Sequence, residues 1–416
     1  MPFHIPPALH HRKFRLLWLG LLISITGSQM QVSAIHWHIR ELTGTPNPLA
    51  LGFIGLVRIL PIILFSFISG PVADTWNRRA ILFVTQTLQA LIAVSLAVLT
   101  FTSHINIGLI YLLTAFQAAT MAFDMPARQA MLPSIVPARD LPNAYSLQSI
   151  AFNGGAIIGP MLGGIVIASL GQGYTYLINA VSFIAVLVAL GMIGKVDQDA
   201  SLSSGINPRA MWEGIRFIRT KPIILSTMIL DFAATFFASA NTMLPIVARD
   251  ILKVGEVGYG LLLSAQATGS VLAGLVISQI HVIRRQGMIF LLAVVVFGVA
   301  TVLFGISPVF ILSMLALMVM GAADAVSTII RNTVRQLNTP DHLRGRMVSI
   351  NQVFFQGGPQ LGEVEAGIIG QLFGVPAAII SGGLGAILAV WWIARRWPEL
   401  IRYDSHESLS MDLAAK

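Results

Sequence analysis

Six ionisable residues lie within or at the ends of long apolar stretches of this sequence, where a charge is costly. A charged group at the centre of a bilayer needs a partner of opposite charge, a water-filled cavity or a proton that neutralises it. Burial favours the neutral form of a carboxyl group and a nearby arginine favours the charged form, so such a carboxyl group can couple transport to a proton gradient. The six residues are Arg58, Asp124, Asp231, Asp324, Glu363 and Glu365.

Position along each stretch separates these candidates. Asp124 and Asp324 lie near the ends of their stretches, close to Arg128 and Arg331, which favours structural charge pairs. Arg58 lies near the middle of its stretch. There, a salt bridge between helices and a cavity-lining role are equally consistent with the position.

Three stretches also carry polar stripes at helical spacing. Glu363 belongs to one stripe, whereas Glu365 points about 200° away around the helix, so Glu363 is the better cavity candidate. If the stripes line one aqueous cavity, we expect Asp231 or Glu363 to exchange a proton for substrate. Arg58 would modulate the acids or contact an anionic group. The stripes are Thr26, Gln29, Ser33, His36 and Arg40; Asp231, Thr235, Ser239 and Thr242; and Gln352, Gln356, Gln360 and Glu363.

Composition indicates what positions these groups. The 416 residues are 55% hydrophobic and 11% charged, and the mean hydropathy is +0.78, far from the usual range of soluble proteins. Twelve segments are long enough to cross about 30 Å of hydrocarbon. We therefore expect an all-α polytopic membrane protein with twelve transmembrane helices. The segments lie near 14–39, 48–70, 80–101, 106–127, 145–170, 173–194, 223–247, 257–280, 286–306, 308–330, 347–373 and 376–394.

The basic residues predict the orientation, because cytoplasmic loops of membrane proteins are rich in Lys and Arg. With both termini in the cytoplasm, only Arg40, Arg249 and Lys253 of the 26 basic residues lie outside, and Arg58 lies within a helix. The net charge of +8 is then a topology signal, and no nucleic-acid partner is expected. The first apolar run is too long for a signal peptide and should remain as a helix.

An internal repeat divides the chain into two halves. Residues 331–374 repeat residues 128–171 at an offset of 203, with matching arginine, proline and glycine positions. An offset near half the chain length indicates two homologous halves. We expect a six-helix half at 1–194, a cytoplasmic linker with an amphipathic helix at 195–222, a second six-helix half at 223–394 and a cytoplasmic tail at 395–416.

A run of glycines marks the first copy of the repeat. Gly155, Gly159 and Gly163 recur at every fourth residue and form one flat helix face, and Gly164 follows them. Such a face lets two helix backbones approach closely within a membrane. Pro160 removes one backbone hydrogen bond, so we expect a bend there.

The loop between the second and third segments contains the most specific motif, SGPVADTWNRRAILF. Its defining residues are Gly70, Asp74, Arg78 and Arg79. Asn77 occupies a turn position suited to left-handed backbone geometry. We expect Asp74 and Arg78 to pair with neighbouring helix ends in one conformational state and to release them in another.

These motifs resemble those of the major facilitator superfamily. The loop is similar to its G-x-x-x-D-x-x-x-R-R signature, and GAIIGPMLGG resembles the G-x-x-x-G-P-x-x-G-G signature of its proton-coupled antiporters. AFDMPARQAMLPSIVPARDLPNA and LRGRMVSIN are similar to the subgroup of the enterobactin exporter and macrolide efflux proteins. The resemblance implies two six-helix halves, alternating access, and a cytoplasmic gate in which Asp124 also meets Arg78.

The chain departs from the family pattern at several points. Thr75 and Asn77 stand where the loop motif usually has a basic residue and a glycine, and the second-half loop SQIHVIRRQG lacks the aspartate. The arginine that many antiporters of the family carry in their fourth helix is missing. Any gate is therefore asymmetric, with the better-formed motif in the first half.

The sequence lacks the motifs that are typical of other functional classes. No G-x-x-x-x-G-K-[ST] frame precedes Gly194 and Lys195, which argues against an ATP-driven pump, and no clustered nucleophile or metal set indicates an enzyme. We predict cofactor-free secondary export of a small amphipathic compound, such as a drug or siderophore, by proton antiport. A facilitator, an importer and a transport-inactive sensor are the alternatives. The protein is expected as a monomer in the inner membrane.

Overall fold

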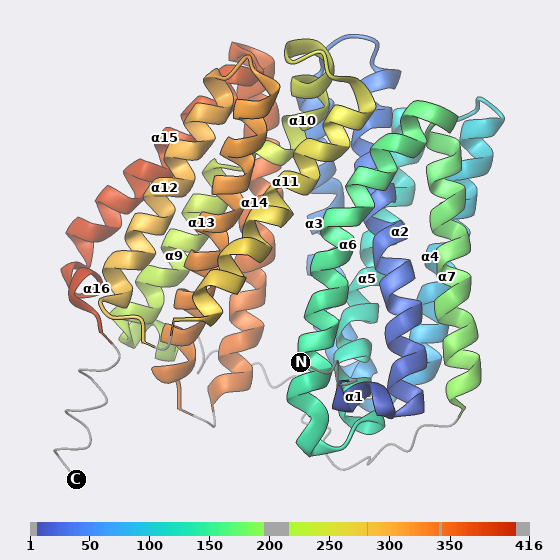
Figure 1. Ribbon diagram of the computed structural model, residues 1–416, viewed down its shortest axis with the longest axis horizontal. Coiled ribbons are helices and arrows are strands. Elements are labelled where there is room, and N and C mark those ends of the chain that lie inside the picture. Colours follow the sequence, from blue (N-terminus) through green and yellow to red (C-terminus); the bar gives the residue numbers. More distant parts are fainter. Residues whose placement is uncertain (1–5, 195–215, 281, 341–342, 405–416) are drawn as a thin grey trace. The chain divides into compact units, whose positions relative to one another are not determined.

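The computed structural model describes residues 6–194, 216–280, 282–340 and 343–404, and each of the twelve predicted segments contains helix (Figure 1). The amphipathic helix expected near Asn207 lies outside these residues. The predicted segments of the first half form α2 (Arg12–Leu42), α3 (Pro48–Thr75), α4 (Arg78–Phe101), α5 (Ile107–Ile135), α6 (Leu141–Leu170) and α7 (Gln172–Ile193).

The second half has its own series of long helices. Eleven helices in the described part of the chain are long and apolar enough to cross a membrane. The remaining predicted segment forms a helix at 344–373 that is not among these eleven. It is 30 residues long and contains the polar stripe of Gln and Glu residues. The series is α9 (Pro222–Phe237), α11 (Gly255–Ser278), α12 (Gln286–Ile306), α13 (Phe310–Leu337), α14 (Arg344–Phe373) and α15 (Val375–Arg396), and the short helices α1 (Pro7–His10) and α16 (Pro398–Arg402) flank the two halves.

The segment expected as one helix at 223–247 is broken in the structure. Helix α9 ends at Phe237, and the chain continues through a 3-10 turn, α10 (Leu244–Ile246) and a π turn. Pro245 lies in the first turn of α10, where its missing N–H costs no internal helical bond. At the break, Ser239 Oγ donates a hydrogen bond to the Pro359 carbonyl oxygen of α14, 3.0 Å away. The prediction of a continuous helix was therefore wrong here.

The chain forms two compact units. The first unit comprises Met1–Pro46, Val57–Ile206 and Val254–Ser264, and the second comprises Asn47–Leu56, Asn207–Lys253 and Ala265–Lys416. The start of α3 therefore groups with the second unit, and the start of α11 groups with the first.

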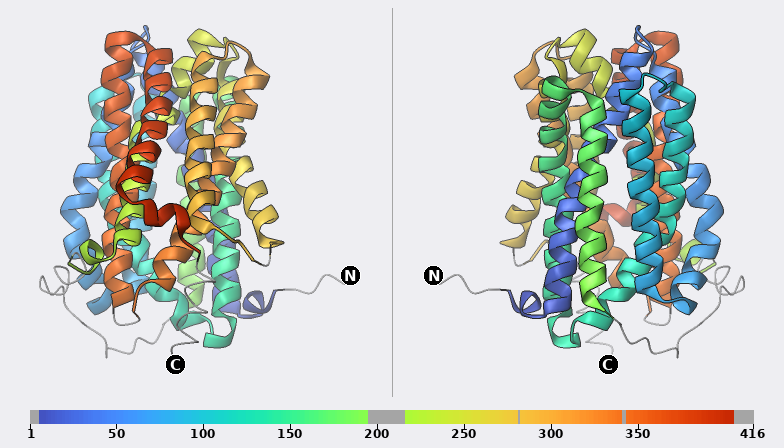
Figure 2. Two further views of the ribbon diagram at one scale, coloured as in Figure 1. Left: turned by 90° about the vertical axis from the view of Figure 1, so that its left-hand side faces the viewer. Right: turned by 90° about the vertical axis from the view of Figure 1, so that its right-hand side faces the viewer.

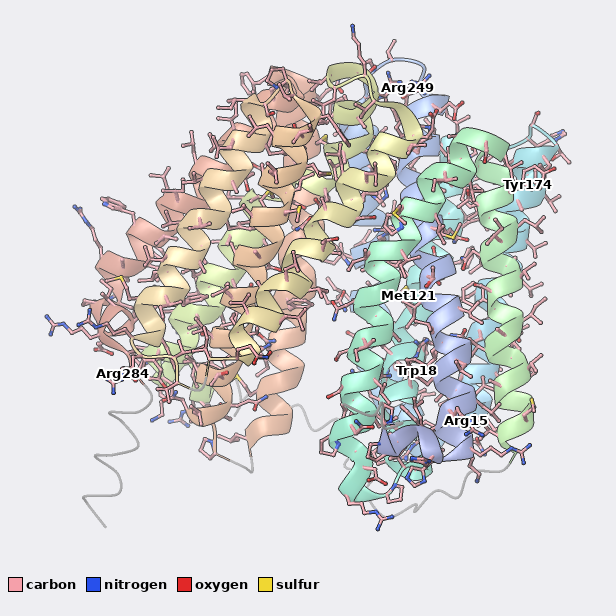
Figure 3. The ribbon with its side chains drawn as sticks, viewed as in Figure 1. Arg15, Trp18, Met121, Tyr174, Arg249 and Arg284 are labelled. Carbon is pink, nitrogen blue, oxygen red and sulfur yellow. The ribbon has the colours of Figure 1, made fainter. Side chains whose placement is uncertain are left out.

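In the first unit, α2 packs against α6 and α7. Trp18 Nε1 donates to the Leu147 carbonyl oxygen at 2.7 Å, and Asn179 Nδ2 donates to Gln31 Oε1 at 2.8 Å. Within this unit, Trp18 lies toward the end that carries Arg15, whereas Tyr174 lies at the opposite end (Figure 3). Polar pairs thus hold apolar helices in one register.

In the second unit, α12 packs against both α13 and α15. Short helix α16 folds back at the end of α15 and contacts α12 (Figure 2). Gly287 N donates to the Tyr403 carbonyl oxygen at 3.1 Å. A Cβ atom at Gly287 would lie only 1.6 Å from the Leu400 carbonyl oxygen, so this contact requires glycine.

The internal repeat has a local structural counterpart. Gly171 ends α6 with φ 90°, and Gly374, its partner in the repeat, ends α14 with φ 89°. Residues with a Cβ atom rarely adopt this backbone geometry, so glycine at both positions permits the same sharp turn into the next helix.

Candidate transport site

The two arginines of the loop motif tie α4 to its neighbours in the first unit. Arg78 Nη1 donates to the Ala130 carbonyl oxygen at 2.9 Å and to Ser134 Oγ at 3.0 Å, both on α5. Arg79 Nε donates to the Leu190 carbonyl oxygen at 2.7 Å. Leu190 lies in the last turn of α7, where carbonyl groups lack partners within the helix. Both arginines therefore bind helix ends.

Asn77 differs from the prediction. It has φ −62°, and its side chain accepts a hydrogen bond from Ala80 N as the N-cap of α4. The predicted left-handed geometry is wrong because this turn needs a capping acceptor for an orphan amide. Gly70 and Asp74 lie in the last turns of α3, and the contacts of these two residues fall outside the described part of the structure.

Asp124 is a fully occupied acceptor inside the first unit. Its Oδ1 atom accepts from Thr85 Oγ1 at 2.9 Å and Gln86 Nε2 at 2.7 Å, and its Oδ2 atom pairs with Arg128 Nη2. The predicted pairing of Asp124 with Arg128 is confirmed. The hydrogen bonds of Arg78 described above go to α5 at Ala130 and Ser134, in place of the Asp124 contact that the family resemblance implied.

The glycine face of α6 lies against α2, with no room for side chains. Close helix approach, expected from the glycine spacing, is thus present. Gly154, one residue away around the helix, faces open space. A Cβ atom would lie 2.7 Å from Ile25 Cγ2 at Gly155, 2.6 Å from Gln29 Cβ at Gly159, and 2.8 Å from Ser33 Oγ at Gly163.

Gly164 and its repeat partner Gly367 each face a second glycine. A Cβ atom at Gly164 would lie 3.2 Å from Gly260 Cα on α11, within the first unit. A Cβ atom at Gly367 would lie 2.9 Å from Gly52 Cα on α3, within the second unit. The two copies of the repeat therefore make equivalent backbone crossings, which explains why the starts of α3 and α11 group as they do.

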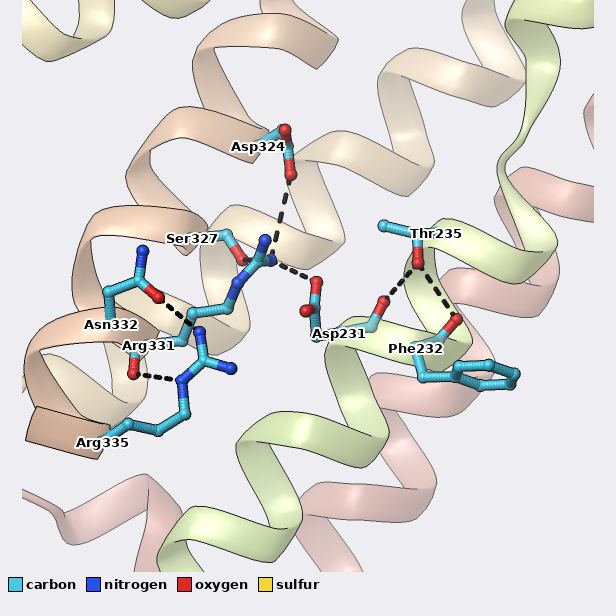
Figure 4. A network of polar contacts seen from close by, with 8 residues as sticks. All are labelled: Asp231, Phe232, Thr235, Asp324, Ser327, Arg331, Asn332 and Arg335. Carbon is cyan, nitrogen blue, oxygen red and sulfur yellow. Dashed lines mark hydrogen bonds and ion pairs between the residues drawn. The ribbon is translucent and has the colours of Figure 1, made fainter. Parts of the chain in front are cut away.

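A buried ion pair joins α9 to α13 in the second unit (Figure 4). Arg331 Nη1 pairs with Asp231 Oδ1, and the two side chains are 3% and 2% exposed. The same Nη1 atom lies 3.9 Å from Asp324 Oδ1, on a side chain that is 42% exposed. It also donates to Ser327 Oγ at 3.3 Å. One guanidinium nitrogen is therefore shared between two carboxylates of different exposure.

A second arginine extends this network. Arg335 Nε donates to the Arg331 carbonyl oxygen at 3.1 Å, and its Nη2 atom binds Asn332 Oδ1. Among the described residues, Asp231 Oδ2, Arg331 Nε and Arg335 Nη1 are buried without a hydrogen-bond partner. The network is thus only partly satisfied.

The two buried aspartates therefore have opposite surroundings. Asp124 receives three hydrogen-bond donors. Asp231 has one ionic partner and an unbonded oxygen in a low-dielectric interior, where a lone charge is expensive. Asp124 is therefore held by several hydrogen-bond donors, whereas Asp231 is held by one close ion pair.

The polar stripe of α2 is largely satisfied within its own helix. Thr26 Oγ1 donates to the Leu22 carbonyl oxygen at 2.8 Å, and Ser33 Oγ donates to that of Met30 at 2.8 Å. The Cβ atom of Gln29 lies at the glycine face of α6. These contacts assign much of the stripe to helix packing.

The remaining cavity candidates are divided between the two units. Arg58 is half-buried in the first unit and interacts electrostatically with His36. Gln356, Gln360 and Glu363 are half-buried on α14 in the second unit. A Cβ atom at Gly55 would lie 2.9 Å from Glu363 Cβ, so Glu363 belongs to the α14 face that packs on the start of α3.

Arg331 was not among the predicted cavity residues. It was expected to pair with Asp324 at a helix end, and it does approach Asp324, but its closer partner is Asp231. The repeat contained a signal: Ser327 occupies the position equivalent to Asp124, so Arg331 lacks the carboxylate that Arg128 finds four residues earlier. Arg331 instead pairs closely with Asp231 on α9 and more distantly with Asp324 on its own helix.

Comparisons with known proteins agree with this architecture. A family model described as transmembrane secretion effector matches residues 5–413. The chain is 26% identical over 386 residues to the multidrug efflux pump Tap of Mycolicibacterium fortuitum, covering 90% of this chain and 93% of that protein. It is 26% identical over 404 residues to the staphyloferrin A transporter of Staphylococcus aureus, covering 95% and 98%.

A third relative and a solved structure extend the likeness. The enterobactin exporter EntS of Salmonella typhimurium is 24% identical over 387 residues, covering 91% of this chain and 90% of that protein. A bacterial homologue of the human lysosomal transporter Spinster, solved in an inward-facing and unoccupied conformation, has a TM-score of 0.72 at 14% identity. The alignment covers 96% of this chain and 97% of that chain, which supports the twelve-helix fold.

Proposed function

The chain belongs to the transmembrane secretion effector family of the major facilitator superfamily, and from that premise we propose that it exports a small amphipathic compound in exchange for protons. The protein is a multi-pass membrane transporter and not an enzyme. Its relatives include a protein named as a multidrug efflux pump and one named as an enterobactin exporter. Under the proposal, the compound is a drug or a siderophore.

The proposal of proton coupling rests on the ion pair of Asp231 and Arg331. Both side chains have buried polar atoms without a hydrogen-bond partner. Protonation of Asp231 would release Arg331 toward Asp324, which already lies 3.9 Å from the same nitrogen. Deprotonation would restore the first pair. The proposal therefore gives Asp231 the coupling role and replaces Arg58 by Arg331 as the cation that modulates it. Glu363 remains the second candidate.

Uncoupler-sensitive export tests this function. Cells with and without the protein are loaded with a panel of labelled drugs and siderophores, and accumulation is measured before and after addition of a protonophore. We expect at least one compound to accumulate less in cells with the protein, and the protonophore to abolish that difference. Asp231→Asn should lose the protonophore-sensitive part, because Asn cannot carry a proton between states.

Two further variants make the result specific. Glu399→Gln removes an exposed carboxylate on α16 and should export like the unmodified protein. Glu363→Gln should retain coupling if Asp231 alone is responsible. If Asp231→Asn, Glu363→Gln and the double variant all keep the protonophore-sensitive export of the unmodified protein, coupling at either acid is refuted. A panel with no exported compound would contradict the export proposal itself.

We further propose that the loop motif gates the cytoplasmic side, with Gly70 and Asp74 at the end of α3, Arg78 and Arg79 at the start of α4, and Asp124 supporting α5. The orientation in this proposal, with both termini in the cytoplasm, is supported by the distribution of basic residues. The proposal also takes the protein to be a monomer in the inner membrane. Arg78 is the test position, because its two hydrogen bonds hold α4 against α5.

Arg78→Gln should open this contact and reduce transport while leaving membrane insertion intact. The chain contains no cysteine, so a single Ala127→Cys reporter on α5 gives an unambiguous signal. Ala127 is 0% exposed, and a water-soluble maleimide should label it faster in the Arg78→Gln background. Arg139→Gln, at a side chain that is 83% exposed, is the control. Equal labelling in all backgrounds would refute the gating role.

A further inference from the structure

An aromatic and basic cluster occupies the end of α15 in the second unit. Trp391 and Trp392 are 53% and 49% exposed. The Arg395 Cζ atom lies 4.2 Å from the centroid of the Trp391 ring, and the Arg396 Cζ atom lies 5.4 Å from that of Trp397. Each exposed guanidinium group thus lies near the face of an indole ring.

Contacts with neighbouring residues hold this cluster in position. Trp392 and Trp397 meet edge to face, with ring centroids 5.6 Å apart at 88°. Trp397 leads directly into α16, whose Leu400 is 1% exposed and packs against the start of α12 at Gly287. The chain beyond α15 is therefore fixed, and the two arginines are held in place before any ligand arrives.

The charges of this cluster are uncompensated. Arg395 and Arg396 are exposed, and neither forms an ion pair with a carboxylate in the described part of the protein. A transmembrane helix ends here, so the cluster lies at the depth of lipid headgroups, where tryptophan is enriched. At that depth the abundant anions are phosphodiester headgroups, and guanidinium groups bind phosphate through two parallel hydrogen bonds.

We propose that Arg395 and Arg396, with Trp391, Trp392 and Trp397, form a binding site for one anionic phospholipid. The guanidinium groups bind the headgroup phosphate, and the exposed Trp391 and Trp392 rings contact the glycerol and upper acyl chains. The site is independent of substrate and proton coupling. Its occupant stabilises the joint between α15 and α16.

Native mass spectrometry with phosphatidylglycerol and phosphatidylcholine as probes tests the site. Each basic residue near an anionic surface contributes roughly fivefold to binding, so Arg395→Gln/Arg396→Gln should weaken retention of the tightest phosphatidylglycerol roughly thirtyfold. Arg12→Gln/Arg15→Gln, at two exposed arginines of α2, removes the same charge and is the matched control. Phosphatidylcholine retention should be low and equal in all variants.

Two additional measurements separate a shaped site from a general attraction. Arg395→Lys/Arg396→Lys keeps the charge but loses the planar stacking, and it should bind phosphatidylglycerol more weakly than the unmodified protein. Phosphatidylglycerol should raise the thermal unfolding temperature of the unmodified protein in detergent, but not that of the Gln variant. Equal loss in the α2 control, or full binding by the Lys variant, would show a nonspecific charge effect and overturn the proposal.

Discussion

Replacing Arg331 with methionine is expected to be the most damaging single change in the second unit, lowering the free energy of unfolding by about 3–5 kcal/mol. The change leaves the Asp231 carboxylate, 2% exposed, without its ionic partner. It also removes the donor to Ser327 and the approach to Asp324. Asp231→Asn should cost less, because Arg331 then retains Asp324 as an alternative partner. Thermal and denaturant unfolding in detergent measures the difference.

The double variant Asp231→Leu/Arg331→Met separates stability from coupling. A buried ion pair replaced by apolar side chains of similar volume is often neutral or more stable, by about 1–4 kcal/mol. We therefore expect the double variant to recover the stability that Arg331→Met loses, while protonophore-sensitive export remains absent. Recovery of both stability and export would assign the pair to helix packing. A stable Arg331→Met single variant would contradict the burial argument.

Gly159→Leu is expected to have the second largest effect, acting through the contact between α6 and α2. A Cβ atom there would lie 2.6 Å from Gln29 Cβ and 2.8 Å from the Thr26 carbonyl oxygen. Backbone cannot yield as a flexible side chain does, so the helices must separate. Overpacking costs roughly 1–3 kcal/mol in well-packed cores, occasionally more. Thermal unfolding temperature and export should fall together.

Gly154→Leu is the matched control for this prediction. It places the same side chain on the same helix, five residues earlier, where no atom lies within 4 Å of a Cβ position. Both variants gain the same apolar volume and helix propensity, so only the contact with α2 differs. Equal stability of the two variants would show that the glycine face does not determine the helix spacing.

The helices were predictable because lipid imposes a simple rule on the sequence. Each spanning segment must satisfy its backbone internally and present an apolar surface, so length and hydropathy suffice to find it. The structure places α12 at Gln286–Ile306, as predicted, and most other ends within a few residues. The larger differences are the ends of α9 at Phe237, α5 at Ile135 and α13 at Leu337. Beyond Phe237, Ser239 contacts the α14 backbone. No local pattern encodes that contact.

The candidate site was predictable only in part. Membrane burial identified Asp231 and Asp124 as unusual, because a charge in an apolar stretch requires an explanation. The hydrogen-bond partners of Asp124 on other helices could not be predicted. Thr85 and Gln86 bind Asp124 from α4, and no spacing within α5 indicates them.

The sequence alone indicated twelve helices in two repeated halves, because hydropathy and glycine spacing are set by the order of the residues. The resemblance of its motifs implied a transporter. Only the tertiary structure decided which charges meet. Arg128 and Arg331 are equivalent in the repeat, yet one binds a carboxylate on its own helix and the other binds Asp231 on α9. An ion pair depends on atoms a few ångströms apart in space, and the packing of helices brings those atoms together.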